Sequence, residues 1–333
     1  MSGSSAPYFE DLSVGLVERA APAITLTDGL AAVHQAIVGD RLALALDAAL
    51  AREVTGSPTA LAHPALVWDV AIGQSTLLTR RVIANLFYRG LALARAPSIG
   101  DTLATSTEVV ALRQTSARDD RVPSGLAVLR VRTVDQLERP VLDFWRCAML
   151  PLRDAGASTG REDAFDAIPA ELDARALRAA TASWRLDAFA ARAGEGRLAQ
   201  IAPGTRWSVE DGDVVSAAPE LARLSLNVAA VHRDRYAHRD GRRLVYGGHT
   251  IAIAAAQASR SLPEIATIVA WHSCEHLAPV HECDTLYSEL ELERYEPLEP
   301  CGGLAHLRSR VIALGERDDG TPVLDWRFVA VVA

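Results

Sequence analysis

Two short motifs occur twice in this chain, in the same order, and this repetition restricts its fold more than any other feature. Asp-Thr-Leu stands at 101–103 and again 183 residues later at 284–286, and Pro-Val-Leu-Asp stands at 140–143 and again 182 residues later at 322–325. Repeated motifs in a fixed order indicate a duplicated structural unit. We therefore interpret the 333 residues as two copies of one unit in a single chain.

Each copy combines one apolar helix with several strands. The sequence predicts the helix at 63–78 in the first copy, with Pro64 in its first turn, and at 247–262 in the second. Many of the segments that follow alternate between apolar and polar residues, which is typical of strands with one buried face. An apolar helix followed by a long antiparallel sheet predicts an α+β fold in which the sheet wraps round the helix.

The predicted organisation has three parts: an N-terminal unit at 1–152, a polar linker with a helix (170–184) at 153–185, and a C-terminal unit at 186–333. Hydrophobic residues make up 49% of the chain, enough for a large core, and the net charge of −8 argues against a nucleic-acid-binding surface. The four cysteines form no Cys-x-x-Cys pair, and no apolar run is long enough to span a membrane. We expect a cytoplasmic protein that does not associate with membranes.

Five stretches together resemble a known family. They are YFEDLSVG at 8–15, ITLTDGLAAVHQAIVGDRLAL at 24–44, IGDTLATSTEVVALRQTS at 99–116, RRLVYGGHTIAIA at 242–254 and HLAPVHECDTLYSELE at 276–291. With them the chain resembles the MaoC-like, hydratase-2-type dehydratases in their double hot-dog form. Within that family it is most similar to the mesaconyl-CoA hydratases, also called β-methylmalyl-CoA dehydratases.

The resemblance implies a fold, an activity and a set of partners. The fold is a tandem (double) hot-dog, with each half a long antiparallel sheet wrapped round a central helix. The activity is the reversible hydration of a short, branched dicarboxylyl enoyl-CoA, with mesaconyl-CoA, itaconyl-CoA and crotonyl-CoA all open as substrates. The enzyme would be a hydro-lyase without cofactor or metal. It would bind acyl-CoA, but no nucleic acid or membrane, and would form a homodimer or a higher homo-oligomer.

The family motif Asp-x-Asn-Pro-x-His has one close counterpart in this chain, at 227–232. His232 is in register, whereas Asn227 replaces the usual Asp and Ala230 replaces the usual Pro. The counterpart in the first half, ending at His34, is degenerate. By resemblance, the C-terminal half is catalytic and the N-terminal half shapes the substrate tunnel.

Hydration of an enoyl thioester needs a base for water, a proton for the α-carbon and donors for the enolate-like oxygen. The resemblance makes His232 the acid/base, because an imidazole titrates near neutral pH. Asn227 could orient the water but cannot accept a proton, and Asp234 is the nearest carboxylate that could replace the missing Asp. We expect the Gly248 N–H, at the start of the second helix, to bind the thioester oxygen.

The residues around the glycine pair are candidates for binding the substrate. Gly247 would let a thioester approach the backbone closely, and Tyr246 and His249 flank the pair. Arg242 and Arg243 would bind either the phosphates of CoA or a second carboxylate of the substrate. The alternative for both arginines is an ordinary solvated surface position.

Three other interpretations stay open. His and Cys residues cluster at 271–283, as in a zinc site, but their spacing fits no standard metal motif. A hot-dog thioesterase would use the same fold to hydrolyse acyl-CoA. A non-catalytic acyl-CoA-binding protein is the alternative that the Asn at 227 supports. Rossmann, P-loop and α/β-hydrolase motifs are all missing from the sequence.

Overall fold

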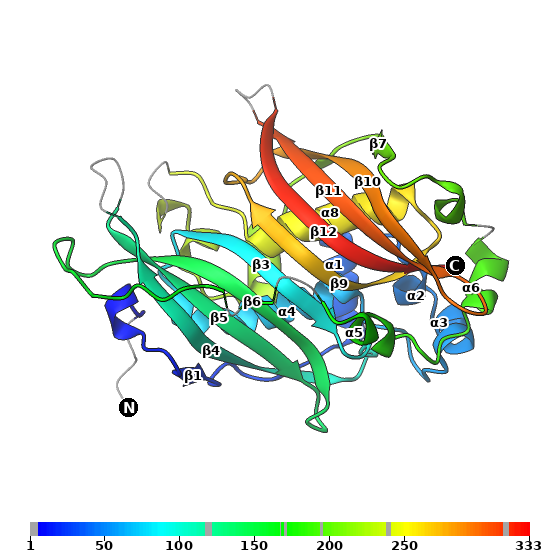
Figure 1. Cartoon of the computed structure of the whole chain (residues 1–333), viewed down its shortest axis with the longest axis horizontal. Coiled ribbons are helices and arrows are strands. Elements are labelled where there is room, and N and C mark those ends of the chain that lie inside the picture. Colours follow the sequence, from blue (N-terminus) through cyan, green and yellow to red (C-terminus); the bar gives the residue numbers. More distant parts are fainter. Residues whose placement is uncertain are drawn as a thin grey trace.

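The structure is a computed structural model that describes residues 6–116, 122–166, 168–169, 172–193, 196–237, 241–315 and 320–333. Its strands form one antiparallel sheet of 12 strands that runs through the whole molecule (Figure 1). The long strands fall into two groups with the same order, β4-β5-β6-β3 and β10-β11-β12-β9. Pairing of β3 with β9 joins the two groups into one sheet.

The long strands follow the predicted segments. In the N-terminal half they are β3 Ala84–Leu93, β4 Thr102–Gln114, β5 Ser124–Val134 and β6 Pro140–Pro151. In the C-terminal half they are β9 Ile265–His276, β10 Thr285–Pro297, β11 Gly303–Leu314 and β12 Thr321–Val332. Four short strands pair with the outer long ones: β1 Val17–Glu18 and β2 Ile24–Thr25 with β4, and β7 Arg206–Ser208 and β8 Asp213–Val214 with β10.

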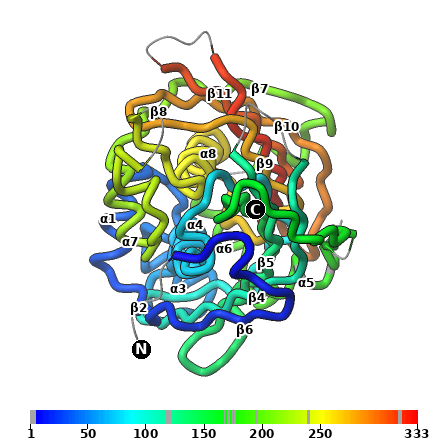
Figure 2. Tube along the Cα trace, turned by 90° about the vertical axis from the view of Figure 1, so that its left-hand side faces the viewer, coloured from blue at the N-terminus to red at the C-terminus, as the bar shows by residue number. Residues whose placement is uncertain are grey.

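One apolar helix lies inside each half of the sheet. Every residue of α4 (Pro64–Gln74) is buried, and α8 (Gly247–Ser261) is buried along all but its ends. The predicted helix at 63–78 ends as α-helix at Gln74 and continues as the 3-10 segment η2 (Ser75–Thr79). Figure 2 shows α4 and α8 in the interior, with strands passing around them.

The two halves repeat each other down to individual hydrogen bonds. In the N-terminal half, Gln74 at the end of α4 donates to the carbonyl of Leu103 and accepts from the Thr105 hydroxyl. In the C-terminal half, Gln257 of α8 donates to the carbonyl of Leu286 and accepts from a serine hydroxyl two residues later. Each pair of equivalent residues is 183 positions apart, as in the sequence repeat.

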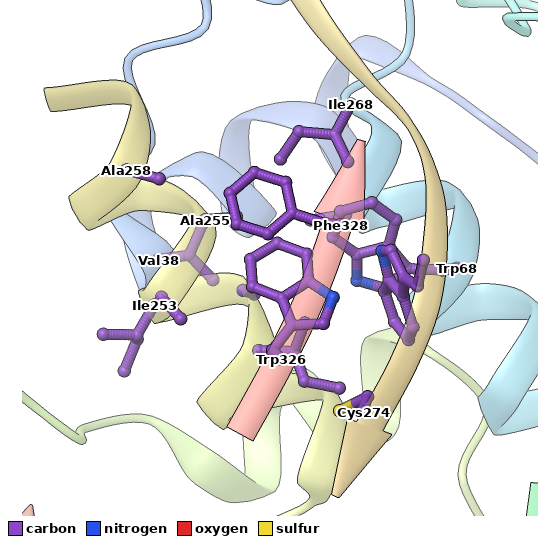
Figure 3. Close-up of a cluster of buried hydrophobic side chains, with 14 of the residues drawn as sticks. Val38, Trp68, Ile253, Ala255, Ala258, Ile268, Cys274, Trp326 and Phe328 are labelled. Atoms are coloured by element: carbon purple, nitrogen blue, oxygen red, sulfur yellow. The ribbon is translucent and has the colours of Figure 1, made fainter. Parts of the chain in front are cut away.

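The two halves share one hydrophobic core. Trp68 of α4 packs edge-on against Trp271 of β9, with ring centroids 4.8 Å apart. On β12, Trp326 stacks on Phe328 with ring centroids 4.0 Å apart. Figure 3 shows these β12 rings beside Trp68 and next to Ala255 of α8. Side chains from both central helices and from the sheet therefore pack together in one cluster.

Shorter helices lie outside this core. They are α1 Asp28–Val38, α2 Ala43–Leu46, α3 Ala48–Thr55, α5 Ala174–Ala179, α6 Leu186–Ala193 and α7 Ala218–Leu224. The helix predicted at 170–184 is shorter in the structure, because the chain turns after Ala179 and the Trp184 N–H donates to the Thr181 carbonyl. Residues 170–171 lie outside the described part. None of the described helices is long and apolar enough to cross a membrane.

Candidate active site

The N-terminus of α8 borders a cavity of about 320 Å³ to which both halves contribute walls. Its polar lining residues include Asn227, His232, Tyr246 and His276 from the C-terminal half, and Thr79, Tyr88 and Arg146 from the N-terminal half. Apolar side chains from β3 and from the segment after β9 complete the lining. A concave, mainly apolar space with a few polar groups is typical of a small-molecule site.

His232 ends the short 3-10 segment η4 (Ala230–His232) and is 9% exposed. Its Nδ1 lies 3.0 Å from the carbonyl oxygen of Leu244. Burial lowers the pKa of His232 to about 4; the hydrogen bond to Leu244 opposes this shift, and the positive charge of Arg146 adds to it. The imidazole is therefore neutral at pH 7. With the Nδ1–H donated to the carbonyl, Nε2 keeps a lone pair and can act as a base.

Asn227 is buried and lines the same cavity. Its Oδ1 accepts a hydrogen bond from the Ala229 N–H at 2.9 Å, which closes the turn that leads to His232. Its Nδ2 has no hydrogen-bond partner among the residues that the structure describes. The amide thus has a structural role through its oxygen and offers an unused donor through its nitrogen.

Tyr246 and Gly247 lie where α8 begins and also line the cavity. The Tyr246 ring lies 5.8 Å from that of His232, measured between centroids. A Cβ atom on Gly247 would come 2.7 Å from Nε2 of His276. Glycine at 247 therefore leaves room for a second imidazole at the helix N-terminus.

Two predicted residues that follow in α8 face away from the cavity. A Cβ atom on Gly248 would come 2.2 Å from Oδ1 of Asp69, so this glycine allows α4 and α8 to pack closely. His249 is fully buried, and burial lowers its pKa to about 4. Neither residue lines the cavity. The oxyanion role of the Gly248 N–H stays a prediction.

Three further predicted residues lie outside the cavity. Asp234 is exposed, and its Oδ1 accepts from the N–H of Tyr236. Arg242 forms an ion pair with Asp284 at 3.1 Å, and Arg243 forms one with a glutamate on the same segment. The structure therefore brings together Asn227, His232, Tyr246 and Gly247, and it places Asp234, Gly248, Arg242, Arg243 and His249 elsewhere.

Arg146 and His276 are two of the cavity residues that were not among the predicted site residues. Arg146 on β6 is 3% exposed, and His276 ends β9; burial lowers the pKa of His276 to about 4. Sequence alternation reveals which face of a strand a residue occupies, but not which segment packs opposite. The repeat did contain a signal for Arg146. The equivalent position of the second copy is the apolar Phe328, so the two copies differ in charge at a position of the same strand.

The histidines and cysteines at 271–283 do not gather. Within the described part of the chain, no group of three or more His, Cys, Asp or Glu side chains is placed to hold a metal ion. His272 stacks on His306 of β11, whereas His276 faces the cavity. His272 and His276, four residues apart on β9, thus contact different parts of the molecule.

Taken together, the cavity offers a neutral base, an unused amide donor and a buried cation. A base and hydrogen-bond donors on the wall of one cavity are the elements of proton transfer to and from a bound substrate.

Comparisons with known proteins extend over nearly the whole chain. No protein-family model matches it. The β-methylmalyl-CoA dehydratase of Chloroflexus aurantiacus is 29% identical over 329 residues, which cover 95% of this chain and 91% of that protein. The mesaconyl-CoA hydratase of Cereibacter sphaeroides is 28% identical over 320 residues, covering 94% and 91%.

Two solved structures are similar over their full length. A conserved hypothetical protein of Mycobacterium tuberculosis with a double hot-dog fold is 52% identical, with a TM-score of 0.91 and 98% of each chain covered. A protein of Chloroflexus aurantiacus assigned to the MaoC-domain dehydratases is 25% identical, with a TM-score of 0.87 and coverage of 100% and 99%. The predicted α+β double hot-dog fold is confirmed.

Proposed function

Because this chain belongs to the MaoC-like double hot-dog dehydratase family, we propose that it adds water reversibly to the double bond of a short enoyl-CoA, with mesaconyl-CoA and β-methylmalyl-CoA as the substrate pair. The enzyme is then a hydro-lyase. The observation that carries the proposal is the neutral imidazole of His232 on the cavity wall, held by the Leu244 carbonyl so that Nε2 is free.

His232 would move the proton. In hydration, Nε2 takes a proton from water while the oxygen bonds to the β-carbon, and the double-bond electrons move onto the thioester. The imidazolium then returns the proton to the α-carbon, so that H and OH have been added across the double bond and the base is restored. A base with a pKa of about 4 is in its active form throughout the neutral range.

The other groups of the cavity would position the reactants. Asn227 Nδ2 is an unused donor that can orient the attacking water. The enolate-like oxygen would lie at the N-terminus of α8, where first-turn N–H groups have no partner within the helix and the helix dipole favours negative charge. Gly247 lines the cavity there, and Gly248 follows it. Asp234, Arg242 and Arg243 take no part in this mechanism, because their side chains bind other groups.

The experiment follows the ultraviolet absorbance of the conjugated thioester with mesaconyl-, itaconyl- and crotonyl-CoA, for the wild type and for His232→Ala. We expect loss of the enoyl signal with mesaconyl-CoA and nearly none in the variant. A wild type that leaves all three enoyl signals unchanged would disprove hydration. Release of free CoA thiol without hydration would indicate a thioesterase, and binding without any turnover would indicate an acyl-CoA-binding protein. A cytoplasmic location and assembly into homo-oligomers stay predictions.

A further inference from the structure

Arg146 is a buried cation on the cavity wall. It lies on β6 in the N-terminal half and is 3% exposed. Its guanidinium donates to the hydroxyl of Thr79, while its Nε has no hydrogen-bond partner among the described residues. No described carboxylate forms an ion pair with it. A buried charge without a counter-charge is costly, so such a group points to a missing partner.

The groups around Arg146 do not supply a negative charge. Its main electrostatic neighbours are the hydroxyls of Tyr88 and Tyr246, and burial raises the pKa of both, so they are neutral at pH 7. Asp69 binds His34 instead, at 3.2 Å. Burial lowers the pKa of Arg146 from its ordinary value, but a guanidinium stays protonated at neutral pH. Among the described residues, nothing therefore compensates the positive charge on the cavity wall.

The second copy of the repeat shows that the fold itself does not need an arginine here. Arg146 pairs with Tyr88 on β3 and with Leu129 on β5. The equivalent position on β12 is Phe328, which pairs with the matching residues of β9 and β11. Phe328 is fully buried and stacks on Trp326 (Figure 3). An aromatic ring thus fills this position well in one half, whereas the other half places a cation beside a cavity.

We propose that Arg146 binds the free carboxylate of a dicarboxylyl-CoA substrate and so determines which acyl groups the enzyme accepts. A guanidinium matches a carboxylate with two parallel hydrogen bonds. In mesaconyl-CoA the carboxylate is attached to the β-carbon, so anchoring it at Arg146 would fix the carbon that receives the hydroxyl group. This role was predicted for Arg242 and Arg243, but both are paired outside the cavity. The effect of Arg146 on the reaction rests on the proposed function. The binding of a carboxylate at Arg146 does not.

The kinetic test compares two substrates of equal shape. Mesaconyl-CoA and (E)-2-methylcrotonyl-CoA differ only in a carboxylate that a methyl group replaces. For Arg146→Gln we expect kcat/KM with mesaconyl-CoA to fall by about 100-fold or more, and kcat/KM with the neutral substrate to change by less than about threefold. Equal losses with both substrates, or no loss with either, would overturn the inference.

A matched control and a conservative variant separate charge from folding. Arg130 on the neighbouring β5 is partly exposed and forms an ion pair with Asp143 at 2.7 Å, so Arg130→Gln should leave the ratio of the two kcat/KM values unchanged. Arg146→Lys keeps a cation and should keep part of the preference for mesaconyl-CoA. Thermal unfolding checks that each variant is folded.

Binding of unreactive ligands keeps the two proposals apart. By isothermal titration calorimetry, the wild type should bind succinyl-CoA more tightly than butyryl-CoA, and Arg146→Gln should abolish this difference. If the wild type shows the difference but hydrates no enoyl-CoA, the proposed function fails and the carboxylate site stands. If it hydrates enoyl-CoA but binds both ligands equally, the carboxylate site fails, whether or not the variant folds.

Discussion

The repeat contains two equivalent places for a cavity, and only one of them is open. At the N-terminus of α8 the space measures about 320 Å³, whereas at the N-terminus of α4 it measures about 10 Å³. The two places match closely in the fold, because the bridge between Leu244 and His281 beside α8 has its counterpart 183 residues earlier, between Leu61 and Ser98. The two places thus share the same arrangement of central helix and flanking bridge, but one is an open cavity and the other is packed.

The residues that line the two places differ. Leu42 and Leu44, before and within α2, fill the space beside α4. The equivalents of the cavity residues Gly247, His276 and Arg146 are Pro64, Leu93 and Phe328. Apolar packing fills the place beside α4, whereas polar residues line the place beside α8. Comparison of the two places thus distinguishes residues that pack the interior from residues that can contact a substrate.

The largest effect should come from His232, when it is compared with His34 at the end of the degenerate motif in the first half. His232→Ala should lower kcat by about 1,000-fold or more, because the only assigned base is lost. His34 does not line the cavity, and its Nε2 lies 3.2 Å from Asp69. His34→Ala should leave kcat of the folded fraction within about threefold. Initial rates measure the effect, scaled to the folded fraction from circular dichroism. Equal inactivity of both variants would contradict the assignment of different roles to the two histidines.

Substitutions in the packed place beside α4 should lower the stability of the protein rather than its activity. Leu42→Ala should lower the free energy of unfolding by about 2–5 kcal/mol and leave kcat unchanged, because it empties a site that the fold has filled. Leu277 lines the open cavity and is 55% exposed, so Leu277→Ala should change the free energy of unfolding by less than about 0.5 kcal/mol. Urea unfolding measures both. Similar losses in the two variants would show that the two places are not packed differently.

A smaller effect should follow from narrowing the open cavity. Gly247→Ala would bring a Cβ atom to 2.7 Å from Nε2 of His276, and we expect kcat/KM to fall by about 10- to 100-fold. In Gly29→Ala the added Cβ atom on α1 would meet nothing closer than an atom of Thr27 at 3.7 Å, so this control should keep full activity. A Gly247→Ala enzyme with wild-type kinetics would mean that this wall does not touch the substrate.

The smallest effect concerns pH. Because burial lowers the pKa of the proposed base His232 to about 4, kcat/KM for hydration should be constant at neutral pH and fall as acid protonates the imidazole near pH 4. His34 has a carboxylate partner, whereas His232 has none among the residues that the structure describes, and Asn227→Asp would supply one. A nearby negative charge favours the imidazolium, so the acid limb should move up by about one pH unit. Stopped-flow rates after a jump in pH measure both profiles, and an unmoved limb would show that residue 227 does not act on His232.

The fold was largely predictable because its signals are local and repeated. The apolar runs that become α4 and α8 are too long and too uniformly hydrophobic for an exposed segment, and the paired motifs align the strands of the two halves. The linker helix was predicted too long, because its turn depends on a hydrogen bond at Trp184 that composition does not reveal.

The candidate site was only partly predictable. A family motif placed Asn227 and His232 close in sequence, and one turn of chain keeps them close in space. Arg146 and His276 reach the cavity from strands of different halves, so their proximity depends on the β3–β9 pairing. Arg242 and Arg243 show the reverse: they are near the motif in sequence, but ion pairs direct them elsewhere.

The continuous sheet from β6 through β3 and β9 to β12 has an evolutionary consequence. In a dimer of identical subunits, every substitution appears twice, so a new charge on one wall is copied onto the other. Here the codons for positions 146 and 328 can change independently, while the sheet keeps the two residues in matching places. Position 146 holds a cation and position 328 an aromatic ring. A chain with both copies can thus specialise a single chamber without exposing its twin to the same mutation.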